Sequence, residues 1–235
     1  MKYLYHGTTG DRLASIQANG IRPRGRDKSR WQMASGRDRV YLTDAYAPYF
    51  ALNEFSPSAP PIVFEIDADK LDAGLFMADE DFVEQATRGG DPQGSMQERT
   101  RYFRNNMRRL TDANPHLTAA LSLEKLGTCA YEGVIPPEAI TQVMVIDKPG
   151  PFALTFDPMI MLANYRICGP EYRFLTAKLF NREPREEDAE DMRLQAERWA
   201  KLGVEKSNGA AALAPYRRLS TLEKAVINTP LESVP

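Results

Sequence analysis

Residues 3–8, Tyr-Leu-Tyr-His-Gly-Thr ("YLYHGT"), decide how we interpret this chain. Residues 3–6 are β-prone and predict a short strand, which the glycines and threonines at 7–10 close. His6 is one of only two histidines in the chain. Histidine titrates nearest to neutral pH, so its place at the end of the first strand makes His6 a candidate functional residue.

The composition is ordinary for a soluble globular protein of 235 residues, with 43% hydrophobic and 26% charged residues. The net charge of −2 gives no global basic excess for nucleic-acid binding, although local patches can still serve it. Cys129 and Cys168 fit neither a disulfide framework nor a zinc cluster, and we expect small core residues. Without a membrane-spanning run or a signal peptide, we expect a cytoplasmic protein with no membrane partner.

The segments that follow the first strand alternate between strand and helix patterns. We expect a helix from Asp11 to about Ala18, further helices at 44–55, 95–110 and 184–203, and strands at 39–44, 61–67, 128–134 and 139–147. This order predicts an α+β domain over residues 1–150, with a helical insertion at about 78–127. Residues 151–235 form a mainly helical C-terminal extension in this prediction.

Three pieces of the sequence share an order with a known enzyme group. "LYHGT" with "LASIQANGIRP", then "RVYLTD" (39–44), then "YEGVIPPEAI" (131–140) resemble the three motifs of the ADP-ribosyltransferase superfamily, on its His-Tyr-Glu branch. Poly(ADP-ribose) polymerases, DNA-modifying ADP-ribosyltransferase toxins and RNA 2′-phosphotransferases share this arrangement. The resemblance covers residues 3–147 and implies a split β-sheet core, with a tyrosine that ends the second motif's strand just before a helix and a glutamate that opens the third motif's strand.

The resemblance implies that NAD is the co-substrate and that ADP-ribose is transferred to a macromolecule, either nucleic acid or protein. Loss of nicotinamide builds positive charge on the ribose, as in glycoside hydrolysis, so a carboxylate should lie nearby. Glu132 is the candidate for that role and for orienting the acceptor. Tyr41 offers a ring face to nicotinamide, and His6 binds the adenosine ribose. These three are the predicted catalytic residues.

Further residues complete the predicted NAD site. Gly7 lets the backbone approach the nicotinamide amide, and Thr8 adds a hydroxyl. Tyr49 supplies the second face for the nicotinamide ring, with Tyr46 and Phe50 as rivals for that role. No metal is expected.

Residues 22–39 form a basic loop, with seven arginines and lysines against two aspartates. Such a loop is either simply solvated or, beside an NAD site, a clamp for the pyrophosphate or for a polyanionic acceptor. The candidate substrate-binding residues in it are Arg24, Arg26, Arg30 and Trp31. Residues 99–109 repeat the mixture of arginines and aromatics.

Several alternatives stay open at this point. Glu65, interpreted as a solvent-facing strand residue, and Glu138, interpreted as a turn residue, compete with Glu132, while His116 is expected at the surface. The chain can also be an RNA 2′-phosphotransferase, although the lobe that those enzymes place ahead of the HGT strand has no counterpart here. A third alternative is a non-catalytic module that binds NAD or a partner.

Overall fold

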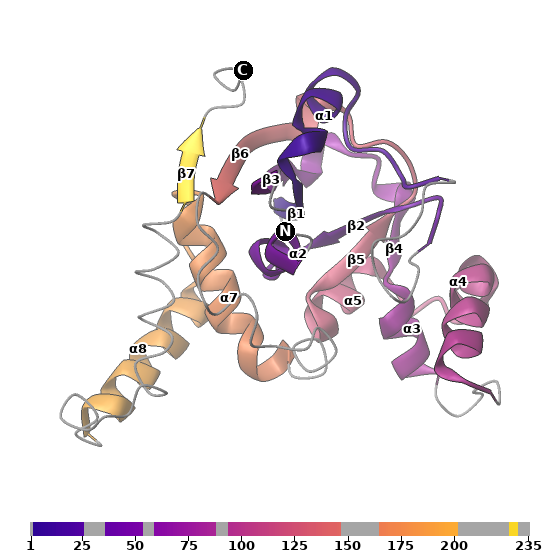
Figure 1. Cartoon of the computed structure of the whole chain (residues 1–235). Coiled ribbons are helices and arrows are strands. Elements are labelled where there is room, and N and C mark those ends of the chain that lie inside the picture. Colours follow the sequence, from indigo (N-terminus) through magenta and orange to yellow (C-terminus); the bar gives the residue numbers. More distant parts are fainter. Residues whose placement is uncertain are drawn as a thin grey trace. The chain divides into compact units, whose positions relative to one another are not determined.

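A computed structural model describes residues 2–25, 36–53, 59–87, 94–146, 165–201 and 226–229 (Figure 1). It confirms the predicted α+β class. The chain forms two compact units whose segments interleave: unit 1 holds 1–4, 13–44 and 67–140, and unit 2 holds 5–12, 45–66 and 141–235. The domain boundary predicted at residue 150 lies outside the described residues.

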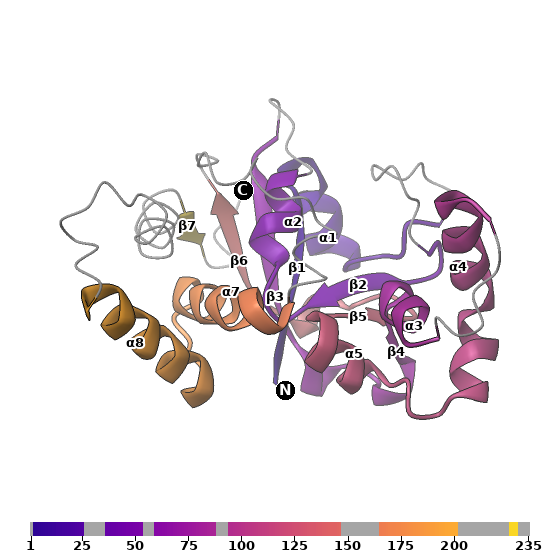
Figure 2. The same ribbon diagram turned by 90° about the horizontal axis from the view of Figure 1, so that it is seen from below.

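Unit 1 is built on three antiparallel strands in the order β4–β5–β2. These strands are β2 (Val40–Thr43), β4 (Phe76–Ala78) and β5 (Thr128–Tyr131). The helices of the unit are α1 (Leu13–Asn19), α3 (Glu80–Ala86), α4 (Met96–Ala113) and α5 (Ala119–Leu126). Helix α5 packs on β4 and β5, and α3 packs on α4 (Figure 2). The last three helices occupy the segment where we expected a helical insertion.

Local sequence explains where these helices begin and end. Ser95 and Glu98 form a capping box that starts α4, which satisfies backbone N–H groups at its first turn. Thr118 caps α5, and Gly127 ends it in a left-handed conformation with φ of 73°. Phe103 and Met107 bury the apolar side of α4, as its sequence pattern predicts.

Unit 2 contains the strands in the order β1–β3–β6–β7. Their bounds are β1 (Tyr3–Thr9, of which the first two residues belong to unit 1), β3 (Pro61–Asp67), β6 (Ile140–Ile146) and β7 (Val226–Thr229). The helices are α2 (Ala47–Asn53), α7 (Tyr165–Leu179) and α8 (Glu186–Lys201). Helix α7 packs on α8, where Arg173 donates hydrogen bonds to the buried carboxylate of Asp188. Strands β4 and β7, of three and four residues, were not predicted from the sequence.

The interpretation of Glu65 as a solvent-facing residue is wrong. All residues of β3 except its last are buried, so the strand is covered on both faces and has no solvent side. Arg182, just after α7, donates to Glu65 Oε2 from Nε at 2.9 Å and to Oε1 from Nη2 at 2.6 Å. Glu65 is therefore a structural ion-pair partner within unit 2.

Candidate functional site

Strand pairing in unit 1 brings Tyr41 and Glu132 to neighbouring strands. Tyr41 lies opposite Ala130, and Val40 lies opposite Tyr131, so Glu132 follows the strand beside the start of β2. The Glu132 N–H donates to the Leu75 carbonyl at 2.9 Å. Glu132 therefore ends a strand, whereas the motif resemblance led us to expect that it opens one.

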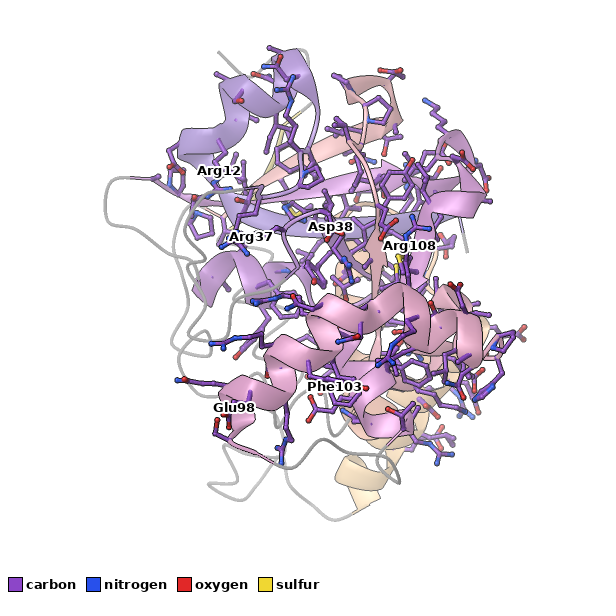
Figure 3. The ribbon with its side chains drawn as sticks, turned by 90° about the vertical axis from the view of Figure 1, so that its right-hand side faces the viewer. Arg12, Arg37, Asp38, Glu98, Phe103 and Arg108 are labelled. Atoms are coloured by element: carbon purple, nitrogen blue, oxygen red, sulfur yellow. The ribbon has the colours of Figure 1, made fainter. Side chains whose placement is uncertain are left out.

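Two arginines contact the Glu132 carboxylate. Arg108 of α4 donates a hydrogen bond to Oε2 and is 72% exposed. Arg39 places its Nη2 3.8 Å from Oε1, and its side chain is only 4% exposed. The Glu132 side chain keeps 12% of its surface exposed, so solvent can reach it. In Figure 3, Arg108 and Asp38 lie beside each other above α4.

The Tyr41 hydroxyl is held by a second carboxylate, that of Glu80. Tyr41 donates to Glu80 Oε1 at 2.6 Å and Oε2 at 2.5 Å, and the Gly36 N–H donates to the tyrosine oxygen at 2.7 Å. A Cβ on Gly36 would lie 2.9 Å from both this oxygen and the Arg39 side chain, so only glycine fits. Burial, followed by the charge of Glu80, raises the pKa of Tyr41 well above its ordinary value.

Glu80 belongs to three successive acids at the start of α3. Burial and the charge of Asp79 raise the pKa of Glu80 to about 7. Burial and the charge of Asp81 raise the pKa of Asp79 to about 7, while burial and Glu80 raise that of Asp81 to about 6. These carboxyls therefore titrate near neutral pH, which is unusual outside functional sites.

Arg39 connects the two carboxylates. Its Nη1 lies 3.9 Å from Glu80 Oε2, its Nη2 lies near Glu132, and its Nε donates to Asp38 Oδ1 at 3.0 Å. Within the described part of the chain, the buried Nη1 has no hydrogen-bond partner. One donor nitrogen of the guanidinium, Nη1, is therefore available to a ligand, while Nη2 of the same group lies near Glu132.

The motif analysis missed the roles of Gly36, Arg39 and Glu80. Arg39 was counted only as one of seven basic loop residues. The acidic run Asp79-Glu80-Asp81 is the usual composition of a solvent-facing helix start, so nothing in its pattern signals burial. The one available signal for a buried acid was Arg39, two residues before Tyr41. A positive charge next to a buried strand requires a negatively charged partner.

The remaining predicted NAD-site residues belong to unit 2. His6 and Gly7 of β1 are half-buried, and Thr8 is buried. A Cβ on Gly7 would come within 2.2 Å of the Ala47 carbonyl oxygen, so close packing on α2 already requires glycine here. The predicted close approach of Gly7 to nicotinamide is thus not needed to explain this residue.

The three candidate rings, Tyr46 just before α2 and Tyr49 and Phe50 on it, differ in exposure. Tyr46 is fully buried and meets the rings of Tyr165 and Tyr172 edge-on, which gives it a packing role. Tyr49 is 5% exposed, and Phe50 is half-buried against it. Tyr46 is therefore the weakest rival for stacking on a ligand.

The exposure of the other predicted residues differs from residue to residue. Among the loop arginines, Arg24 is half-buried, whereas Arg26, Arg30 and Trp31 lie outside the described residues. Glu138 and His116 are exposed, and Cys129 is buried, all as predicted.

Across the described residues no cluster of histidine, cysteine and acidic side chains could hold a metal ion. None of the helices searched there has the length and apolar character needed to cross a bilayer.

Comparisons with known proteins give little. No protein-family model matches the chain, and no curated protein matches it at a significant level. Among solved structures, a chain titled EcPltA is similar over 64% of this chain and 78% of its own length, with 14% sequence identity and a TM-score of 0.37. A likeness of this strength defines neither the fold nor the function of the chain.

Proposed function

We propose that the chain is a mono-ADP-ribosyltransferase that moves ADP-ribose from NAD to a nucleic acid or a protein. One observation carries the proposal: Tyr41 lies on β2, Glu132 directly follows the paired strand β5, and Arg39 beside Tyr41 contacts the Glu132 carboxylate. The order of the three sequence motifs adds to this support. The roles of His6, Gly7, Thr8 and Tyr49 toward NAD stay predictions from the sequence.

The residues of unit 1 suit the chemistry of this reaction. The bond between ribose C1′ and the nicotinamide nitrogen breaks, and its electron pair leaves with nicotinamide. An oxygen or nitrogen of the acceptor then bonds to C1′ and gives up its proton. Glu132 is the group that opposes the positive charge of the oxocarbenium-like transition state and can accept that proton.

The Arg108 contact does not block this role. An ion pair with so exposed an arginine contributes little free energy, so a substrate can displace Arg108 from Glu132 at small cost. The buried Arg39, whose Nη2 lies 3.8 Å from Oε1, stays behind and keeps the carboxylate oriented.

The test compares Glu132→Gln with Glu138→Gln, a matched control in the exposed turn six residues later. Each protein is incubated with NAD labelled in its adenine, with DNA, RNA and cell protein as acceptors, and nicotinamide release and label transfer are measured. We expect Glu132→Gln to lower the rate at least about 100-fold, as the loss of an acid-base group does. The control should match the parent.

Three results would contradict the proposal. They are equal rates in parent and Glu132→Gln, loss of activity in Glu138→Gln alone, and NAD binding without nicotinamide release under every acceptor condition. Release of phosphate from a 2′-phosphorylated RNA would instead identify a phosphotransferase.

A further inference from the structure

We propose that Glu80 is a positioning residue for Glu132: it anchors the Tyr41 hydroxyl and, through Arg39, fixes the orientation of the Glu132 carboxylate. This inference rests on the proposed function, because it assigns a second carboxylate to the same site. Nothing in the three sequence motifs includes Glu80.

The first step is the contact between Glu80 and Tyr41. Both carboxylate oxygens accept from one phenol, and the Gly36 N–H also donates to Glu80 Oε1 at 3.2 Å. The Tyr41 pKa is raised, so the hydroxyl keeps its proton and remains a donor. These bonds fix the edge of the Tyr41 ring while leaving its side chain partly exposed.

The second step is the bridge through Arg39. The guanidinium lies between Glu80 Oε2 and Glu132 Oε1, at 3.9 Å and 3.8 Å, and its side chain is almost fully buried. A buried guanidinium is planar and rigid, so the charge on either carboxylate affects where the other is held. Asp38, largely exposed, binds the third edge of Arg39.

Arg39 also has a donor nitrogen, Nη1, that forms no hydrogen bond within the described residues. Its buried Nη1 is too far from Glu80 for a hydrogen bond and has no other partner within the described residues. Leaving such a donor unsatisfied is costly, which favours an oxygen atom of a substrate as its partner. The charge of Glu80 holds this donor in place without forming a hydrogen bond to it, while Nη2 of the same guanidinium lies near Glu132.

The arrangement depends on the charge of Glu80. The groups that face it are Asp79 and Asp81 on its own segment, and Tyr41, Arg39 and the Gly36 N–H from the start of β2 and the loop before it. Below about pH 7 the Glu80 carboxyl gains a proton and its attraction for Arg39 is lost. Activity should therefore fall as the pH drops through neutrality.

The decisive variant is Glu80→Gln, which keeps the shape of the side chain and removes its charge. Its matched control is Glu84→Gln on the same helix, whose partner is the surface Arg99. At pH 8 we expect Glu80→Gln to lower kcat by up to about 100-fold, the effect of a small misplacement of a reacting group. The KM for NAD should stay within about twofold, since no contact to substrate is removed.

Stability separates positioning from a merely structural role. The pKa of Glu80 is higher in the folded chain than its ordinary value of 4.5. The stabilisation linked to this shift is fully present below about pH 4.5 and is lost as the pH rises through about 7. Glutamine cannot ionise and keeps it, so the stability of Glu80→Gln relative to the parent should rise between pH 4 and pH 8. A structural role predicts lower stability together with lower activity.

A measurement independent of turnover completes the test. In protein labelled with ¹³C at the glutamate carboxyl, the Glu132 resonance is identified by its loss in Glu132→Gln. We expect the chemical shift of this resonance to change with pH, with a midpoint near pH 7, in the parent and in Glu84→Gln. In Glu80→Gln this change should be absent.

The two proposals fail in different ways. If Glu80→Gln retains the parent's kcat, or leaves the Glu132 resonance and its response to Glu80 near pH 7 unchanged, the positioning role is overturned. If the parent does not turn over NAD but its Glu132 resonance still responds to Glu80, the proposed function fails and the structural coupling stands.

Discussion

Among the described residues, each unit of this protein buries one glutamate next to an arginine, and the two glutamates are bound very differently. In unit 2, Glu65 is fully buried, and its carboxylate accepts two hydrogen bonds from Arg182, one from Thr141 and one from Gln142. In unit 1, Glu80 is also buried but accepts from a neutral phenol and an amide, while its arginine stays 3.9 Å away. A carboxylate whose charge is fully compensated serves the fold, whereas one that is only partly compensated is available for chemistry.

The largest expected effect breaks the compensated pair. Arg182→Ala leaves the Glu65 carboxylate buried without its cation, so we expect a loss of about 3 kcal/mol in the free energy of unfolding. This figure is at the lower end for buried pairs because Arg182 is 32% exposed. Urea denaturation of the variant and of the exposed control Arg185→Ala measures it. A loss below about 0.5 kcal/mol would mean that water or the donors Thr141 and Gln142 satisfy Glu65 without Arg182.

A smaller effect of opposite sign is expected in the acidic cluster of unit 1. Asp79→Asn keeps the side-chain oxygen that caps α3 but removes the ionisable carboxyl group. Burial and the charge of Asp81 raise the pKa of that carboxyl to about 7. The parent loses the linked stabilisation as the pH rises from about 4 through 7, and the variant does not. At pH 8 we expect the variant to be more stable by an amount on the order of 1 kcal/mol.

Denaturation curves at pH 8, 6 and 4 check this prediction, because the gap between variant and parent should close toward pH 4. Removal of the Asp79 charge also removes one cause of the raised Glu80 pKa. The acid limb of the activity profile should therefore move to lower pH. A variant that is less stable than the parent at every pH would show that the Asp79 carboxylate supports the fold.

The same contrast explains how much could be predicted from sequence. The strand at 61–67 and the helices at 95–110 and 184–203 were predicted because periodicity, caps and turn residues act locally. The burial of Glu65 was not predicted, because it depends on Arg182, far along the chain. The Tyr41 and Glu132 candidates came from short motifs, whereas Glu80 and Gly36 become visible only when strand pairing and helix packing bring distant segments together.

The smallest expected effect concerns the exposed arginine of the candidate site. Arg108→Gln removes a surface ion pair with Glu132, and such pairs contribute at most about 1 kcal/mol to stability. We therefore expect a change below this value in the free energy of unfolding, which shrinks further in 0.5 M salt because exposed charges are screened. Arg101→Gln, exposed on the same helix, is the control for loss of an arginine alone. A loss well above that of the control, persisting in high salt, would mean that Arg108 anchors α4 to β5 and that Glu132 is a structural acid like Glu65. The contrast between Glu65 and Glu80 would then no longer separate function from fold, because the carboxylates of both units would serve to stabilise the structure.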